Sequence, residues 1–477
     1  MAGGESESGD AQVMKLAWSH FAAQRFDLAE ELGHRAIGER ADDHDAANLL
    51  ALVAYRTGRA GEAIGWMERA IGSNPRMPAF HANLCEMYRR AGEPERAAEA
   101  GRRALALDPS HVLALNNLGA ALLAMGDVRG ALDCLTRQVE INPKNPVFHL
   151  RRAMLRMLLG DVDGGLAEYE WRLAVPEARP QGRAALRPAA PPGQMWRGEP
   201  VVGKKLFFWS EQGLGDAIHC MRFFPALMAQ GPLRLAGKLP PKLAPLIALN
   251  FPYVTILPQD AEPEAADHHF ELMSLLRLVG RGRFRTETGA PYLHAPAAQV
   301  EGFRRFFSQY PGLRIGLVWS GNSNHRDDAR RSMPGRELLP LLDVEGCHFF
   351  SLQIGARPDD AALFGAGVID LSREVSNMTA TASAIAALDL VIGVDTSLIH
   401  LAGALGTPVW TMLAEVPDWR WGLGTISTPL YRSMRLFRQQ RGGDWPGVIR
   451  DVRAALTRAA ASGMAASGGH AGGGKAS

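Results

Sequence analysis

The chain contains 477 residues and carries 52 lysines and arginines against 50 aspartates and glutamates, a formal net charge of +2. This balance argues against nucleic acid or an anionic membrane surface as the main partner, because both favour a large basic excess. The hydrophobic content of 47% is that of a globular protein, and the length predicts about three domains.

The cysteines and the apolar segments indicate a cytoplasmic protein. The four cysteines lie far apart and form no CxxC pair, which indicates neither a disulfide framework nor a zinc site. The polar N-terminus has no apolar signal segment, and no apolar run reaches the length of a membrane span. We therefore expect a cytoplasmic chain without a membrane span and without a metal site.

Residue types recur every 34 residues in the N-terminal third. The recurring positions are Gly58, Gly92, Gly126 and Gly160; Leu16, Leu50, Leu84 and Leu118; Ala63, Ala97 and Ala131; and Pro75, Pro109 and Pro143. In a helical hairpin, glycine accepts the positive φ of the turn, alanine lets two helices approach and proline ends the unit. The predicted units, about five, cover 10–43, 44–77, 78–111, 112–145 and 146–179, and the first lacks the turn glycine.

The spacing and residue types of these recurring positions resemble the tetratricopeptide repeat. An array of such repeats usually offers a groove to a peptide or a protein, so the resemblance implies a protein partner or a protein acceptor. The alternative, in which the repeats only assemble copies of the chain into a homo-oligomer, stays open.

Beyond a proline-rich segment at 180–194, which we interpret as a linker, short apolar runs alternate with helical patterns. The expected strands cover 204–209, 314–319, 347–353, 368–371 and 390–394, and the expected helices cover 217–229, 336–342, 379–388 and 446–459. Such alternation predicts parallel Rossmann-like sheets in two halves, 195–300 and 310–460. The predicted fold class is α + α/β: a helical solenoid, an α/β pair and a disordered tail at 461–477.

The segment Glu211-Gln-Gly-Leu-Gly-Asp216 joins the first of these strands to its helix. Gly213 and Gly215 let the backbone approach a ligand at the positive end of the helix. The third glycine of a GxGxxG dinucleotide motif is absent. Asp216 is either the N-cap of the helix or a reactive carboxylate. Pro225 should kink or split the same helix.

A second candidate segment follows the strand at 390–394. The amides of Thr396, Ser397 and Leu398 would lie at the N-terminus of an apolar helix, where an anion binds readily. The alternative interpretation makes Asp395 and Thr396 helix caps and His400 a packed core histidine.

The loop after the strand at 314–319 is cationic. It carries Asn322, His325, Arg326, Arg330 and Arg331. Because this loop and the second candidate segment both follow strand ends, they are expected on the same side of a parallel sheet, where the loop would neutralise a diphosphate. A solvated charged loop is the alternative.

Residues 200–455 resemble glycosyltransferase family nine, the group of the lipopolysaccharide heptosyltransferases, chiefly through VIGVDTSLIHLAGALGTPVW at 391–410. The resemblance implies a GT-B fold with an acceptor half and a donor half. It implies donor phosphates at Asp395, Thr396, Ser397, Leu398 and His400, with Asn322, Arg326, Arg330 and Arg331 beside them. It also implies Asp216 as general base, with Glu211, Gln212, Gly213 and Gly215 on the acceptor side. Ser397 stands where the family commonly has glycine.

The order of repeats, EQGLGD, VWSGNSNHRDD and PDWRW resembles a bacterial group of tetratricopeptide proteins with a family-nine-like domain. This resemblance implies a transferase architecture and leaves the substrate open. The leading hypothesis is an inverting, metal-independent glycosyltransferase that uses a nucleotide sugar as substrate, needs no cofactor, and modifies a protein or a surface glycan. The rival hypothesis is a non-catalytic scaffold with a degenerate transferase domain. A nucleotide-sugar epimerase is disfavoured, because the NAD-binding GxGxxG is absent.

Overall fold

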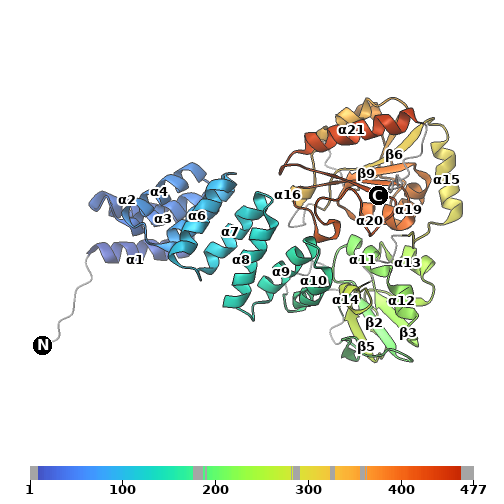
Figure 1. The fold of residues 1–477 in the computed structure, drawn as a ribbon, viewed down its shortest axis with the longest axis horizontal. Coiled ribbons are helices and arrows are strands. Elements are labelled where there is room, and N and C mark those ends of the chain that lie inside the picture. Colours follow the sequence, from blue (N-terminus) through green and yellow to red (C-terminus); the bar gives the residue numbers. More distant parts are fainter. Residues whose placement is uncertain are drawn as a thin grey trace, which may run out of the picture. The chain divides into compact units, whose positions relative to one another are not determined.

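The structure, a computed structural model, describes residues 9–175, 186–187, 191–280, 282, 290–322, 328–354, 360 and 363–462. Contacts divide the chain into two compact units, Met1–Arg152 and Ala153–Ser477 (Figure 1). Much of the predicted linker, the predicted tail beyond residue 462, and Arg326 lie outside the described residues. The predicted domain limits stay predictions.

The N-terminal helices form a tetratricopeptide-type solenoid, as predicted. Each predicted 34-residue unit contains two helices that form a hairpin; in the last hairpin, Arg156 of the first helix pairs with Glu168 of the second. The helices are α1 (Gly9–Ala22), α2 (Phe26–Glu39), α3 (His44–Arg56), α4 (Ala60–Ser73), α5 (Pro78–Arg90), α6 (Pro94–Leu107), α7 (Val112–Ala124), α8 (Val128–Ile141), α9 (Pro146–Leu158) and α10 (Val162–Tyr169). A short 3₁₀ helix, η1 (Glu170–Ala174), follows in the second unit.

The turns of the solenoid explain its glycines. Gly58, Gly92, Gly126 and Gly160 have φ values of +83°, +80°, +75° and +98°, a region that side chains with a Cβ rarely adopt. Gln24 stands one step of 34 residues before Gly58, and its φ is +58°; among the described residues it is the one non-glycine with a positive φ. The first turn therefore keeps the left-handed geometry without glycine.

The alanine column is buried at the helix contacts. Ala63, Ala97 and Ala131 are each 0% exposed. On α6, a Cβ on Gly101 would stand 2.9 Å from the Cβ of Leu118 on α7. Small residues at these positions allow the helices to approach closely, as the periodicity predicted.

The first half of the α/β region contains a parallel sheet in the order β1-β5-β2-β3-β4. Its strands are β1 (Gln194–Met195), β2 (Lys205–Trp209), β3 (Arg234–Lys238), β4 (Val254–Leu257) and β5 (His268–Glu271). Its helices are α11 (Leu214–Met221), α12 (Phe224–Met228), α13 (Ala244–Asn250), η4 (Leu272–Ser274) and α14 (Leu275–Leu278). The helix expected at 217–229 is thus split, with Pro225 in the first turn of α12.

The second half contains a parallel sheet in the order β11-β10-β9-β6-β7-β8. The strands are β6 (Leu313–Val318), β7 (Cys347–Ser351), β8 (Val368–Asp370), β9 (Leu390–Val394), β10 (Val409–Leu413) and β11 (Met434–Arg438). The other elements are α15 (Ala297–Phe307), α16 (Asp328–Arg331), η5 (Gly335–Leu338), α17 (Leu339–Leu342), η6 (Gly365–Gly367), α19 (Met378–Ala387), α20 (Ser397–Leu405), η7 (Trp419–Trp421) and α21 (Trp445–Ala461). Ile315, Leu317 and Ile392 of the sheet pack with Val448 and Val452 of α21 in one core.

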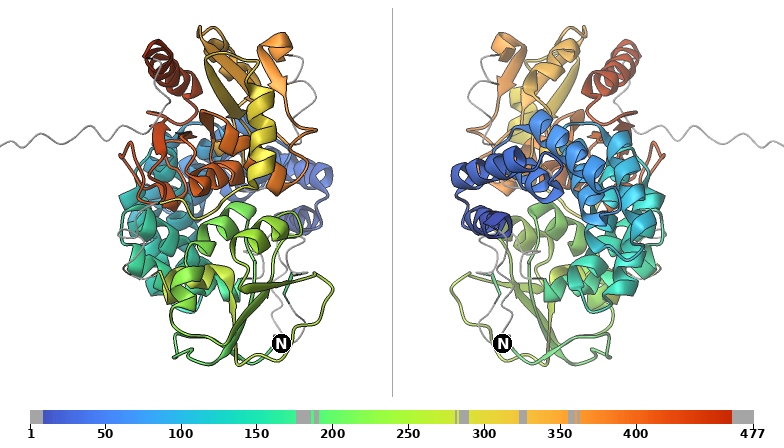
Figure 2. Two further views of the ribbon diagram at one scale, coloured as in Figure 1. Left: turned by 90° about the vertical axis from the view of Figure 1, so that its right-hand side faces the viewer. Right: turned by 90° about the vertical axis from the view of Figure 1, so that its left-hand side faces the viewer.

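The two halves meet through helices. The left view of Figure 2 shows green helices of the first half next to orange helices of the second half, and α11 packs on α20 while α13 packs on α19. The two parallel sheets with their helices are the Rossmann-like halves that the alternating pattern predicted.

In each sheet, successive strands are added first on one side of an inner strand and then on its other side. In the first sheet β3 and β4 follow on one side of β2, whereas β5 lies on the other side. In the second sheet β7 and β8 follow on one side of β6, whereas β9 lies on the other. Ligands of open α/β sheets bind at the carboxyl ends of the strands, at the point where the side changes. The loops after β2, β6 and β9, which carry the three candidate segments, therefore lie where this rule expects a site.

Candidate active site

Asp216 lies in the first turn of α11. Gly213 is the N-cap and Asp216 is the third residue of the helix, so the interpretation of Asp216 as the N-cap is wrong, because Leu214 and Gly215 are already helical. One carboxylate oxygen, Oδ2, accepts a hydrogen bond of 2.6 Å from the amide of Gly213. The other, Oδ1, forms an ion pair with the guanidinium of Arg420. The carboxylate is thus held from two sides.

Arg420, on η7, is the residue of this site that the sequence analysis missed. Besides Asp216, its guanidinium contacts Asp418, with Nη1 at 2.8 Å from Oδ1, and its Nε donates to Nδ1 of His219 at 3.3 Å. The guanidinium also lies 4.6 Å from the ring centre of Trp419. Its side chain is 8% exposed. The signal in the sequence was the cation inside PDWRW, just after a buried strand.

His400 is a packed histidine. Its Nδ1 lies 2.9 Å from the hydroxyl of Tyr431, with which it forms a hydrogen bond, and its ring stacks on Trp421 at 5.1 Å and 26°. Burial, together with the charge of Arg420, lowers the pKa of His400 well below its ordinary value. These contacts are those of the core histidine that the sequence left open as an alternative.

Thr396 occupies the N-cap of α20, but its side chain makes no capping hydrogen bond. The residue is 9% exposed, and its Oγ1 has no hydrogen-bond partner. Buried hydroxyl groups are nearly always paired in folded proteins, and an exception calls for a ligand or a water. The uncapped N-terminus of α20, which begins with Ser397 and Leu398, therefore has the features of an anion-binding site.

Asp395 directly follows β9 at the same end of the sheet. Its pKa is raised to about 6, because the residue is buried and because the charge of Asp418 disfavours a second negative charge nearby. Arg331 and Arg420 act in the opposite direction on the same carboxyl group. Both arginines therefore lie close enough to Asp395 to act on its charge.

In the described part of the cationic loop after β6, Arg331 lies nearest to the site. Arg331 is half-buried, and its Nε lies 3.5 Å from Oδ1 of the buried Asp328. Asp328 also accepts a 2.7 Å hydrogen bond from Ser332. Arg330 and Asn322 are exposed. Of Arg330 and Arg331, both expected beside the donor phosphates, Arg331 is thus the one whose charge acts on Asp395.

The two candidate helices touch at their N-terminal turns. A Cβ on Gly215 of α11 would stand 2.8 Å from Cδ2 of His400 and 3.4 Å from Cα of Ser397 on α20. Only glycine allows this approach. Two helix N-termini, each with a partial positive charge, therefore meet beside Arg331 and Arg420.

Glu211 points into the protein and does not face a ligand. Its Oε1 accepts hydrogen bonds from Arg172 at 3.1 Å and from the amide of Met273 at 3.2 Å. Burial raises the pKa of Glu211 to about 7. Gln212 and Gly213, the next residues of the loop, are half-buried. The acceptor-side role that the resemblance implied for Glu211 thus has no support in its contacts.

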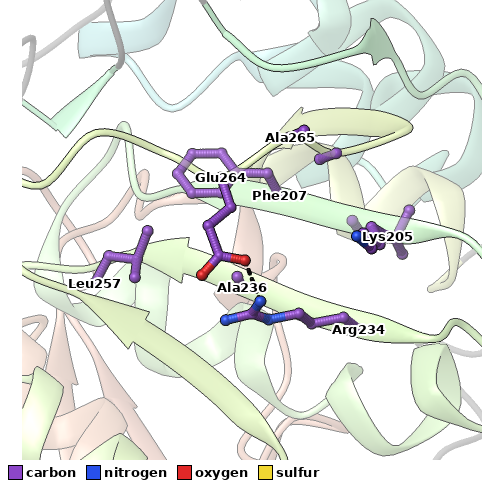
Figure 3. Close-up of a pocket in the computed structure, with 9 residues that line it drawn as sticks. Lys205, Phe207, Arg234, Ala236, Leu257, Glu264 and Ala265 are labelled. Atoms are coloured by element: carbon purple, nitrogen blue, oxygen red, sulfur yellow. Dashed lines mark hydrogen bonds and ion pairs between the residues drawn. The ribbon is translucent and has the colours of Figure 1, made fainter.

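A pocket elsewhere on the first sheet contains none of these residues (Figure 3). It is lined by Lys205, Leu206, Phe207, Arg234, Ala236, Leu257, Glu264, Ala265 and Ala266, and an ion pair joins Arg234 to Glu264. Among the described residues, no cluster of histidine, cysteine and acidic side chains is arranged to hold a metal ion. In the same part of the chain, no helix has the length and apolar character needed to cross a bilayer.

Comparison with protein families assigns both parts of the chain. Tetratricopeptide repeat families match residues 14–78 and 88–155, and glycosyltransferase family 9 (heptosyltransferase) matches residues 376–442. The chain carries tetratricopeptide repeats and a glycosyltransferase family 9 segment. This segment contains the N-terminus of α20 and Arg420, and Asp216 lies outside it. The family 9 segment indicates a glycosyltransferase, and the repeats indicate interactions with proteins.

The chain is similar to named proteins over different lengths. It is 29% identical to Protein FlbA of Caulobacter vibrioides over 451 residues, which cover 87% of this chain and 73% of that protein. It is 30% identical to small glutamine-rich tetratricopeptide repeat-containing protein 2 of Mycosarcoma maydis over 109 residues, 23% of this chain and 30% of that protein. The match to the crystal structure of MamA covers 35% of this chain and 95% of the MamA chain, with 15% identity and a TM-score of 0.32.

Proposed function

We propose that the chain is an inverting, metal-independent glycosyltransferase of the GT-B type. It moves a sugar from a nucleoside diphosphate sugar to a hydroxyl group of a protein or a surface glycan, and the repeats recruit the acceptor or a partner protein. One observation carries the proposal: the contact of Gly215 with His400 brings the carboxylate of Asp216 and the uncapped N-terminus of α20 into one site.

The donor diphosphate belongs at the N-terminus of α20. The free amide groups there bind phosphate oxygens, and the unpartnered hydroxyl of Thr396 supplies a further donor. Arg331 adds a positive charge from the loop after β6. The residue that directly follows β9 is Asp395, and the next two, Thr396 and Ser397, are uncharged. His400 supports this helix turn from within through Tyr431 and Trp421.

Asp216 is the general base of the proposed reaction. Oδ2 of Asp216 accepts from the amide of Gly213, and Oδ1 pairs with the guanidinium of Arg420. Each oxygen has a further lone pair that can accept a hydrogen bond from the acceptor hydroxyl. As the acceptor oxygen forms its bond to the anomeric carbon, its proton passes to Asp216. The bond from that carbon to the diphosphate breaks on the opposite face, which inverts the configuration.

The leaving diphosphate is stabilised by fixed positive groups. The N-terminus of α20, Arg331 and Arg420 are already in place before the charge develops, so no reorganisation is needed during the reaction. This arrangement supplies the electrostatic part of catalysis and leaves the donor nucleotide and the sugar to be found by experiment.

The test is a single substitution with a matched control. Asp216→Asn keeps the shape of the side chain and should lower kcat at least 1,000-fold, while the Kd of the donor stays within about threefold. Asp444, which caps α21 through the amide of Gly447, provides the control, and Asp444→Asn should retain activity. Full activity of Asp216→Asn would refute the assignment.

The scaffold hypothesis makes a different prediction for the unmodified protein. Calorimetry with a panel of nucleotide sugars should detect binding to a transferase. If none of the sugars binds, the α/β region is a scaffold and the function lies in the repeats.

A further inference from the structure

A buried arginine lies at the carboxyl ends of two neighbouring strands of the first sheet. Arg172 belongs to η1, the 3₁₀ helix that follows α10, and it is 2% exposed. It contacts Glu211, which follows β2, and Ser274, which follows β5. These two strands flank the point where strand addition changes sides in the first sheet, which is where an α/β sheet otherwise receives a ligand.

The contacts of Arg172 join three segments of the second unit. Its Nη2 donates to Ser274 at 2.7 Å and lies 3.1 Å from Oε1 of Glu211, and its Nη1 contacts Glu170 at 2.5 Å. The same Oε1 of Glu211 accepts the amide of Met273 at 3.2 Å, whereas Oε2 has no hydrogen-bond partner. A single carboxylate oxygen thus ties η1, the loop after β2 and the end of β5 together.

The loop held by this oxygen needs an anchor. It runs from Glu211 to Asp216 and contains Gly213 and Gly215, whose backbones have more freedom than those of other residues. Within the part of the chain that the structure describes, Arg172 is the charged donor that holds Glu211. Since the site requires Asp216 to be placed within a fraction of an ångström, the position of Glu211 matters for the chemistry.

We propose that Arg172 is a positioning residue that holds the Glu211–Asp216 loop in its working conformation. Its influence on catalysis rests on the proposed function, but its influence on the loop does not. Arg172, which follows the last helical hairpin, then contributes to the site of the α/β unit. Its guanidinium occupies the space at the carboxyl ends of β2 and β5, so an acceptor cannot bind there.

The test compares three full-length variants by two readouts. Arg172→Met removes the charge and leaves Glu211 buried without a counter-ion, so it should lower Tm. Arg172→Met with Glu211→Gln removes both charges and keeps an acceptor for Met273, so Tm should largely recover. Arg156→Met is the control, because Arg156 pairs with Asp161 and Glu168 in the last hairpin.

The first readout is amide hydrogen exchange, which needs no activity. In the double variant, exchange in residues 211–216 should be at least tenfold faster than in the wild type, with exchange in α20 unchanged. Unchanged exchange in the loop would overturn the proposal. Faster exchange in a protein that binds no nucleotide sugar would support the positioning role while the transferase function fails.

The second readout separates positioning from stability. In the double variant kcat should stay at least tenfold low although Tm has recovered, and the Kd of the donor should stay within about threefold. If kcat recovers together with Tm, Arg172 acts on stability alone and the proposal is wrong. The control Arg156→Met should leave both readouts unchanged.

Discussion

Arg420 and Asp216 lie 204 residues apart in the sequence and form an ion pair between the two halves of the α/β unit. The carboxylate comes from α11 of the first half, and the guanidinium comes from η7 of the second half. Because the guanidinium also contacts Asp418 and His219, its orientation is determined by several neighbours. The direction of the Asp216 carboxylate is therefore set jointly by Gly213 of its own half and by Arg420 of the other half.

Replacement of Arg420 should impair both catalysis and stability. Arg420→Gln leaves the partly exposed carboxylates of Asp216 and Asp418 without their shared cation, so Tm should fall, by less than the loss of one partner from a fully buried ion pair would cause. We expect kcat to fall at least tenfold in kinetic assays. Arg420→Lys should be intermediate, because one ammonium group cannot replace a planar fork with several donors.

A second arginine of the same half serves as the control for Arg420. Arg435 is exposed and lies over the rings of Trp410 and Phe437, away from Asp216. Arg435→Gln should leave kcat unchanged. Addition of free guanidinium ion at low concentration should restore part of the activity of Arg420→Ala, an effect that a general loss of folding would not show.

Thr396→Val should change stability and donor affinity in opposite directions. The hydroxyl of Thr396 is buried without a partner in the free protein, so its removal should leave Tm unchanged or raise it slightly. The same change removes a donor to the diphosphate and should weaken donor binding about tenfold, or about 1.4 kcal/mol. Calorimetry and thermal unfolding measure the two effects. Thr396→Ser keeps the hydroxyl and should bind the donor as the wild type does. If Thr396→Val binds the donor with the same affinity as the wild type, the proposed phosphate site is contradicted.

Donor binding should weaken as the pH rises through about 6. The raised pKa of Asp395 keeps this carboxyl group neutral below that pH, and above it the group becomes an anion beside the anionic donor. The Kd of a nucleotide sugar should therefore rise between pH 5 and pH 7.5 at constant ionic strength. Asp395→Asn should flatten this dependence. A nucleotide sugar is the suitable probe, because its diphosphate diester does not titrate in this range. A wild-type Kd that falls with rising pH would contradict the prediction.

The first turn of the solenoid offers a test of the repeat geometry. Gln24 has a φ of +58° without being glycine, so Gln24→Gly should raise the unfolding free energy of the array by about 0.5–1 kcal/mol. Gly58→Ala should lower it by about 1 kcal/mol, although a Cβ there would meet no atom within 4 Å. Urea unfolding gives both values. Gly61, which lies in α4 with equal space around it, is the control, and Gly61→Ala should be stabilising.

Much of the fold follows from periodicity in the sequence. The step of 34 residues predicted every hairpin of the solenoid, because each turn and each close helix contact selects a particular small residue. Strand β9, over Leu390–Val394, matches its predicted bounds. The start of α11 was predicted three residues late, because Gly215 had the character of a helix breaker. In the structure it lies inside the helix, where only glycine leaves room for His400.

The candidate site was predicted only in part. Asp216, Asp395 and Thr396 stand in local patterns that mark strand ends and helix starts, and such patterns are visible along the sequence. Arg420 was missed because its meaning depends on a partner in the other half, which no local spacing reveals. The inward direction of Glu211 was missed for the same reason, since Arg172 reaches it from a distant segment.

The anchoring of Glu211 by Arg172 also bears on how such chains diversify. Whole 34-residue units between α3 and α8 can be gained or lost without a change in Arg172, Glu211 or Ser274, the three residues of this anchor. The segment η1 has no such freedom, because Arg172 must be inherited together with Glu211 and Ser274. The number of repeats can therefore change while η1 and the loop before Asp216 are inherited as one block.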